Sequence, residues 1–242
     1  MRLVIEPAVF DCFDQVRIGL LCGSIHAPRD DLDAGIEDLR DTALAGFLAR
    51  GLDAAALVAH PKVAEWRNAY RRFGTNVRSH RPTHEALARR LLRDARWPGR
   101  INPIVDVYLT NQLTHLLPHG GYDLDQIAGA LRLAVSPGGE PFEPLGGGLE
   151  TTQERELVYR DDSRVLTRRW NFRDCDFTKV TATTTRFVLM LESAGTLIPD
   201  VEIEAATVDL RNRYERLWTG EFTSVVERLT SDHPSLTFGS LA

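Results

Sequence analysis

Apolar side chains recur every three to four residues in the first half of the chain and again near its C-terminal end. This spacing is typical of amphipathic helices that bury one face. Leu32, Ile36, Leu39 and Leu44 show it most clearly, and Gly51 supplies a stop signal. The pattern predicts helices over residues 30–51, 63–73, from 83 to the Trp-Pro-Gly break at 97–99, 103–117 and about 201–218.

The middle of the chain carries short strand-like segments bounded by turn residues. Residues 118–121 are expected to form a turn, and Asp123 is expected to cap a short helix that Gly129 closes. This order of elements favours one compact α+β domain, with central, mostly antiparallel strands flanked by helices, over a doubly wound α/β sheet. The expected strands are 3–9, 15–22, 131–135, 141–145, 156–160, 164–170 and 186–192.

The predicted helix over residues 103–117 is apolar almost all round, which is typical of a helix in the protein core. Asn102 followed by Pro103 suits a helix start, because the Asn side chain can accept free N–H groups and proline fits the first turn. The few polar residues on this helix, Asp106, Thr110 and Asn111, must line a pocket or reach an edge.

Composition indicates an ordinary soluble globular protein of 242 residues, 43% of them hydrophobic. The apolar stretches are far shorter than a membrane-spanning helix needs, and the N-terminus lacks the apolar core of a signal peptide, so we expect a cytoplasmic protein. The three cysteines fit a reducing compartment. The cysteines and histidines show no ligand spacing, so neither a metal nor a cofactor is expected.

The formal net charge of −5 argues against a general nucleic-acid coat protein, but the charge is unevenly distributed. Residues 67–100 contain ten arginines and two acids, a local charge of +8, which leaves −13 for the remainder because −5 minus 8 is −13. Such a segment can attract a polyanion locally. The alternative is a solvated helical face in a chain that prefers arginine, since only two of its basic residues are lysines.

Three ordered segments rise above this background: Arg100-Ile-Asn-Pro-Ile-Val-Asp-Val107, Pro118-His-Gly-Gly-Tyr-Asp-Leu-Asp-Gln-Ile127, and Trp170-Asn-Phe-Arg-Asp174. Together with Leu191-Glu-Ser-Ala194 they resemble the B3/B4 domain of the β subunit of bacterial phenylalanyl-tRNA synthetase, which edits aminoacyl-tRNA. Trp66-Arg-Asn-Ala-Tyr70 is similar to free-standing members of this family. The resemblance is strongest over 83–194 and implies one B3/B4-like domain spanning 1–242, with 1–82 and 195–242 as packing extensions.

The resemblance implies a pocket for an aminoacyl group, and it also shows two departures from the family pattern. The family's pocket histidine falls on Gly120, with His119 one place earlier, and its pocket glutamate falls on Arg173. A guanidinium only donates hydrogen bonds, so specificity for tyrosine is not carried over. The predicted catalytic residues are His119, Gly120, Gly121, Asp106 and Asn111, and the predicted substrate-binding residues are Asn171, Arg173, Asp174 and Thr178.

Hydrolysis of an aminoacyl ester needs a positioned water and donors aimed at the developing oxyanion. His119 is the candidate base, and Gly120 and Gly121 are candidate backbone donors. Trans hydrolysis of misacylated tRNA is therefore the leading hypothesis, with the tRNA acceptor end as partner and with neither DNA nor membrane. The alternatives are a non-catalytic module for tRNA or an amino acid, and a metabolic enzyme using the same pocket. The predicted tRNA-binding residues are Arg78, Arg81, Arg89, Arg90 and Arg93.

Overall fold

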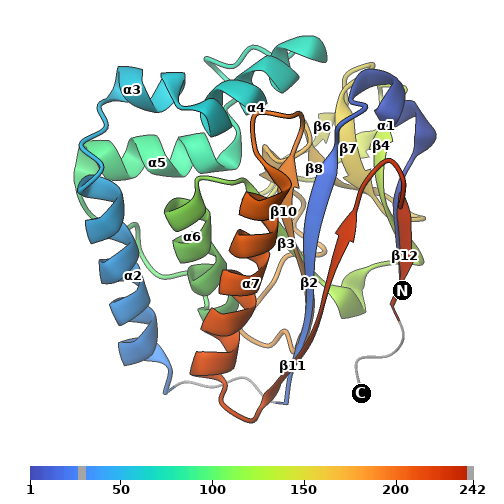
Figure 1. The fold of residues 1–242 in the computed structure, drawn as a ribbon. Helices are drawn as coiled ribbons and strands as arrows, with labels where there is room; N and C mark the ends of the chain where they lie inside the picture. Colours follow the sequence, from blue (N-terminus) through green and yellow to red (C-terminus); the bar gives the residue numbers. More distant parts are fainter. Residues whose placement is uncertain (27–30, 239–242) are drawn as a thin grey trace.

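A computed structural model describes residues 1–26 and 31–238. In these residues the strands form two main sheets that pack face to face, and helices cover the outer face of one of them (Figure 1). The four-stranded sheet has the order β11-β2-β10-β3, and every neighbouring pair is antiparallel. Its strands are β2 (Arg17–Ile25), β3 (His119–Asp123), β10 (Arg186–Ser193) and β11 (Phe222–Leu229).

The central strand β10 divides the core because alternate side chains point to opposite faces of the sheet. Phe187, Leu189 and Leu191 pack against the helices, whereas Val188 and Met190 face the second sheet. The helices on the outer face stand side by side in Figure 1. They are α2 (Asp33–Leu48), α6 (Pro103–His115) and α7 (Asp200–Leu217).

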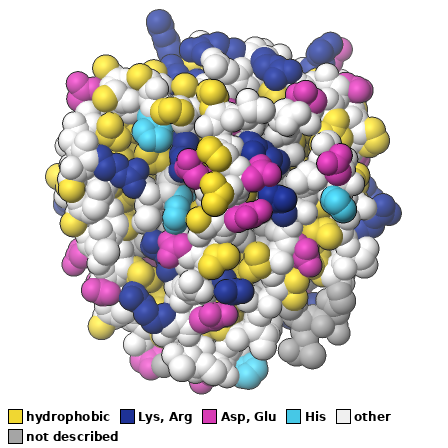
Figure 2. Space-filling view, viewed as in Figure 1, with side chains coloured by type: hydrophobic (Ala, Val, Ile, Leu, Met, Phe, Trp, Pro, Cys, Tyr) yellow, Lys and Arg dark blue, Asp and Glu magenta, His cyan; other side chains and the backbone are white. Residues whose placement is uncertain are grey.

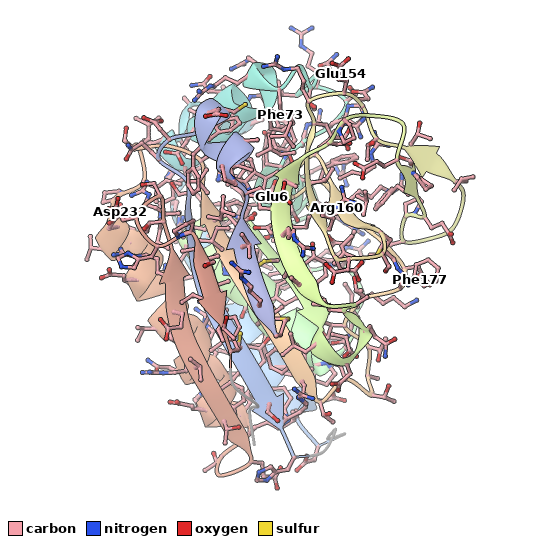
Figure 3. All side chains as sticks on the ribbon, turned by 90° about the vertical axis from the view of Figure 1, so that its right-hand side faces the viewer. Glu6, Phe73, Glu154, Arg160, Phe177 and Asp232 are labelled. Atoms are coloured by element: carbon pink, nitrogen blue, oxygen red, sulfur yellow. The ribbon has the colours of Figure 1, made fainter. Side chains whose placement is uncertain are left out.

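The second sheet has six strands in the order β12-β1-β4-β7-β8-β9. Only β1 and β4 run parallel, and the other neighbouring pairs are antiparallel. Figure 3 views the molecule from this side, with Glu6 after β1 and Arg160 on β7 labelled. The strands are β1 (Arg2–Ile5), β4 (Ala130–Val135), β7 (Leu157–Arg160), β8 (Val165–Arg168), β9 (Arg173–Asp174) and β12 (Ser235–Thr237).

Three further helices cover one end of the sandwich and share an apolar cluster with α2 and α6 (Figure 1). They are α3 (Ala54–Ala59), α4 (Pro61–Arg72) and α5 (Thr83–Asp94). The remaining short elements are α1 (Pro7–Cys12), the 3₁₀ turn η1 (Leu124–Gln126) and the pair β5 (Pro141–Phe142) and β6 (Glu150–Thr151). No helix in the described residues is long and apolar enough to cross a membrane.

The predicted α+β class and the long helices are confirmed, although the predicted start of α2 at Asp30 lies outside the described residues. The Asn102 side chain caps α6 by accepting from the Val105 N–H at 3.0 Å, and Asp123 caps η1 as expected. Two predictions were wrong. Residues 118–121 are not a turn, because His119 begins β3, and the strand expected over 3–9 ends at Ile5, because Pro7 opens α1.

The two adjacent glycines of β3 face different surroundings. A Cβ on Gly121 would lie 2.5 Å from Cδ2 of the buried Leu189 and 3.2 Å from the carbonyl oxygen of Val188. A Cβ on Gly120 would meet only the Met190 methyl, at 3.9 Å. Gly121 therefore lets β3 approach β10 on the helix side, whereas Gly120 leaves open space on the other face.

We expect Gly121→Ala to lower the free energy of unfolding by about 1–3 kcal/mol, because the added methyl overpacks the contact with β10. Gly120→Ala is the matched control one residue away and should change stability by about 0.5 kcal/mol or less. Urea denaturation of both variants measures the difference. Equal stabilities for the two variants would contradict this account of the close approach.

Candidate functional site

A small polar cleft of about 40 Å³ lies between the two sheets, near the start of α5. The four-stranded sheet lines it with His119, Gly120, Tyr122, Met190 and Glu192. The six-stranded sheet and the turn between β8 and β9 line it with Tyr159, Thr167, Trp170, Asn171, Phe172 and Asp174, and Thr83 of α5 closes one side. A cavity of this size holds about one to three waters.

Glu192 is the most deeply buried carboxylate of the cleft, with 1% of its surface exposed. It accepts hydrogen bonds from the Tyr159 hydroxyl, from Trp170 Nε1 at 2.9 Å and from Asn171 Nδ2 at 3.1 Å. Burial raises its pKa to about 7, even though these three donors favour the charged form and oppose the rise. All three donors come from the side of the six-stranded sheet, so Glu192 connects the two sheets.

The turn after β8 holds this donor set in place. Arg169 and Trp170 both adopt left-handed backbone conformations, with φ of 49° and 67°. The Trp170 indole is buried against Trp66 and Phe13, with ring centroids 4.8 and 5.2 Å apart. The side-chain oxygen Oδ1 of Asn171 accepts a hydrogen bond from the Tyr70 hydroxyl at 2.8 Å. Two consecutive left-handed residues are strained, and such strain is concentrated at functional sites.

Asp174 is the second carboxylate of the cleft. Its Oδ1 accepts from the Thr167 hydroxyl at 2.5 Å, and the Tyr122 hydroxyl in turn contacts Thr167. Burial raises the pKa of Asp174, and the bond from Thr167 opposes the rise. Among the described residues, Thr167 is the one side chain that donates to Asp174, and it binds Oδ1, so Oδ2 is available to a bound molecule.

His119 lies at the cleft through its position in β3, but its ring points to the helix side. Nδ1 lies 2.8 Å from the Leu117 carbonyl oxygen, and Nε2 lies 2.6 Å from Asn111 Oδ1. Burial lowers the pKa of the imidazole to about 3. Since both nitrogens already face protein acceptors, the ring does not fit the predicted role of general base. Asn111 holds that ring and donates to Asp209 at 3.0 Å, away from the cleft.

The two predicted backbone donors differ in availability. Glu192 N–H donates to the Pro118 carbonyl oxygen at 3.3 Å, and the alternation of an antiparallel ladder then makes Met190 and Gly120 a hydrogen-bonded pair. The N–H of Gly120 is therefore used within the sheet, although Gly120 itself lines the cleft. Gly121 is not among the lining residues, and its N–H points to the open side of β3.

Three other predicted site residues lie away from the cleft. Asp106 is buried beside the loop before α6, where it accepts from Arg100 and from the Ile101 N–H at 3.2 Å. Arg173 is exposed and pairs with Glu150 at 2.9 Å instead of with Asp174. Thr178 is buried against Cys175, and its carbonyl oxygen accepts from the Asp123 N–H. Asp106 and Thr178 therefore stabilise the fold and do not fit the predicted catalytic and substrate-binding roles.

The predicted tRNA-binding arginines follow α5 and the segment before it. The carboxylate of Glu85 is buried and lies 2.7 Å from Arg67, 3.9 Å from Arg81 and 3.7 Å from Arg89. Arg78, Arg90 and Arg93 are exposed, and Asp94 lies close to the last two. In Figure 2 basic side chains gather along the upper edge, beyond α5. Thr83 at the start of α5 connects this surface to the cleft.

Sequence reasoning missed eight of the twelve residues that line the cleft, among them Glu192, Tyr159, Tyr122 and Thr167. One signal was available for Glu192, which is the single charged residue in the apolar run from Phe187 to Ala194. A charge in a strand that is buried on both faces must have partners. The tyrosines carry no such signal, because a buried tyrosine packs in a core equally well.

The fold and the site define an α+β domain that encloses a polar cleft with two carboxylates between its sheets. The family model described as the B3/4 domain matches residues 65–230, and the chain belongs to this family. No curated protein matches. Among solved structures, an N-terminal fragment of the phenylalanyl-tRNA synthetase β-subunit from Pyrococcus horikoshii is similar, with a TM-score of 0.43 and 11% identity. The match covers 93% of this chain and 53% of that fragment, so the chain spans about half of it.

The raised pKa of Glu192 makes a pH-dependent contribution to stability. The folded state holds its proton up to about pH 7, whereas the unfolded chain releases it near 4.5, so this stabilisation is complete below 4.5 and is lost as the pH rises through 7. Glu192→Gln has no such titration. We expect the variant to be less stable by about 1–3 kcal/mol at pH 5, because its amide faces donors, and the gap to narrow by pH 8.

Urea denaturation at a series of pH values measures this gap. Taking the difference between the two proteins cancels other titrating groups, including His84 and His119, whose lowered pKa values act in the opposite direction. Exposed Glu154→Gln is the control, and its difference from the wild type should stay small and constant (Figure 3). A gap for Glu192→Gln that does not change between pH 5 and pH 8 would contradict the buried titration.

Proposed function

We propose that this protein hydrolyses the aminoacyl ester of misacylated tRNA in trans. The motif resemblance to the B3/B4 editing domain supplies the substrate class. The observation that carries the proposal is Asp174, a carboxylate with a raised pKa and an available oxygen, in a polar cleft beside the uncapped start of a helix. A carboxylate whose pKa lies closer to neutrality is a better general base at physiological pH.

The proposed reaction needs only groups that line the cleft. Asp174 takes a proton from a water, the water oxygen attacks the ester carbonyl carbon, and the protonated Asp174 returns the proton to the departing ribose oxygen. The products are a free amino acid and an uncharged tRNA. The first turn of α5 has no side-chain cap, so its N–H groups beside Thr83 are candidate donors to the developing oxyanion.

The size of the cleft limits how the substrate enters. A volume of about 40 Å³ accommodates the water but not an amino-acid side chain. The aminoacyl group must therefore bind at the mouth, beside Thr83 and Phe172, or open the cleft as it enters. Thr83 lies at this mouth, and Arg89, Arg90 and Arg93 follow about 9 to 15 Å further along α5, a distance that suits the RNA next to the ester.

A non-catalytic module that binds tRNA or an amino acid is the second candidate. Two observations favour it: the small cleft, and the imidazole of His119 that turns away from the cleft with both nitrogens engaged. This module would use the same arginine surface and would leave the ester intact. Hydrolysis therefore separates the two candidates, whereas binding does not.

Incubation with a panel of tRNAs, each charged with a different amino acid, tests the proposal. We expect the wild type to release at least one amino acid faster than the uncatalysed reaction. Asp174→Asn keeps the acceptor for Thr167 and removes the base, and should lower kcat by about 10²-fold or more. Asp176→Asn is the control, because Asp176 is exposed and pairs with Lys179.

The outcomes of this assay separate the candidates. Release by the wild type and by Asp176→Asn, with loss in Asp174→Asn, supports the proposal. Equal rates for all three proteins would exclude Asp174 as the base. Absence of release from every charged tRNA, together with salt-sensitive binding, would overturn the proposed hydrolysis in favour of the binding module.

Salt dependence tests the arginine surface. We expect log Kd to change with log salt concentration by about 0.7 per phosphate contact on single-stranded RNA. The triple variant Arg89→Gln, Arg90→Gln, Arg93→Gln should weaken tRNA binding and reduce this slope by about 2. The control is the triple variant Arg211→Gln, Arg216→Gln, Arg228→Gln. These arginines lie on α7 and β11 and also pair with carboxylates. Both variants lose three positive charges. Equal salt slopes of log Kd for the two variants would therefore contradict a specific contact between the α5 arginines and tRNA.

A further inference from the structure

A buried arginine beside the cleft lacks a carboxylate partner. Arg169 is only 6% exposed, yet in the part of the chain that the structure describes its guanidinium makes no ion pair or hydrogen bond. Its neighbour Arg168 is buried to a similar degree but donates to Glu156 through Nε and Nη2, at 2.8 and 2.9 Å, and to Glu150 through Nη1. Buried charges are normally paired, whereas the Arg169 guanidinium meets only solvent and the ring of Phe172.

The guanidinium of Arg169 belongs to the mouth of the cleft. Its Cζ lies 5.5 Å from the ring centroid of Phe172, a residue that lines the cleft. The His80 ring contacts the same phenylalanine, with centroids 5.0 Å apart. Burial lowers the pKa of His80, and the positive charge of Arg169 lowers it further. Although the Arg169 side chain is mostly buried, its nitrogen atoms are not sealed from water and reach solvent.

The charges around Arg169 leave a positive surplus. Arg168 and Arg173 both bind Glu150, and Arg168 also binds Glu156, so these two carboxylates are already occupied by other cations. Three arginines therefore share two acids. Burial and the charge of Arg168 both lower the pKa of Arg169, which means that an added anion would be favoured there.

The backbone also commits Arg169 to this position. Its φ of 49° places it at the start of the strained turn that carries Trp170 and Asn171 to Glu192. Arginine is less favourable than glycine in the left-handed region, because its Cβ clashes with the backbone there. The energetic cost of the turn and the cost of an unpaired buried charge fall on the same residue, which indicates a ligand-binding role.

We propose that Arg169 binds the phosphate of the terminal nucleotide of the tRNA 3′ end, with the ring of Phe172 beside the base or ribose. A guanidinium suits phosphate because its donors match the phosphate oxygens. An aromatic ring next to a cation is a common arrangement for single-stranded nucleotides. The inference rests on the proposed function, because that function supplies the terminal adenosine.

Calorimetric titration with adenosine 5′-monophosphate, and with adenosine as the uncharged analogue, tests this site. We expect the wild type to bind the monophosphate about tenfold or more tightly than adenosine. Arg169→Met keeps an unbranched side chain over Phe172 and should abolish this preference. Arg169→Lys keeps the charge without the fork and should retain part of it.

The matched control is Arg164→Met. The Arg164 guanidinium also lies over an aromatic ring, 4.3 Å from the centroid of Phe177, which is labelled in Figure 3. Arg164 and Phe177 line a different surface depression. This variant should keep the wild-type preference for the monophosphate. Thermal unfolding of each variant establishes that it is folded before titration.

Two results would overturn the inference: equal affinity of the wild type for monophosphate and adenosine, or an unchanged preference in folded Arg169→Met. The hydrolysis assay keeps these failures apart from failure of the proposed function. If Arg169→Met releases amino acid with an unchanged KM for tRNA, the hydrolase survives without this subsite. If monophosphate binding depends on Arg169 but no charged tRNA is hydrolysed, the subsite survives and the hydrolase is wrong.

Discussion

The structure depends on the burial of one carboxylate, Glu192, between two sheets. A buried carboxylate is tolerated only when donors replace the water that it loses. Its three donors, from Tyr159, Trp170 and Asn171, all belong to the opposite sheet or to the turn that follows β8. The turn must therefore adopt its left-handed conformation, and α4 must lie where Tyr70 reaches Asn171. The cleft is the space that this arrangement leaves open.

The same burial affects both carboxylates of the cleft, Glu192 and Asp174, but their hydrogen bonds differ. The charge of Asp174 contributes to the raised pKa of Glu192, because two negative charges in one small cavity repel each other. The pKa of Glu192 reaches about 7 despite three donors, whereas Asp174 is stabilised by Thr167 alone. Glu192, with hydrogen bonds to both oxygens, is a positioning residue that holds the turn. In the proposed reaction Asp174, with an available oxygen, exchanges a proton with the bound water.

The sequence predicted those features that local patterns determine. Helices α2, α5, α6 and α7 follow the spacing of apolar residues, because each buries one face or lies wholly in the core. Strand β3 was missed because its two glycines, which are usually turn residues, permit a close approach to β10 that only the fold reveals. The half-exposed strand β11 was missed because its residues alternate between intermediate and exposed positions. The donors to Glu192 are 21 to 33 residues away in the chain, so no local pattern identifies them.

Charge shows the same distinction between local sequence and folded surface. Residues 67–100 carry +8 in sequence, but part of that charge serves the fold, because buried Glu85 holds Arg67 close and lies near Arg81 and Arg89. This contact fixes the first turns of α5 against α4, and Thr83 at the start of α5 borders the cleft. Arg169 adds a positive charge beside Phe172, which lines the same cleft. In the proposed complex Arg169, which is buried against Phe172, meets the anion without the entropy cost of ordering a flexible side chain.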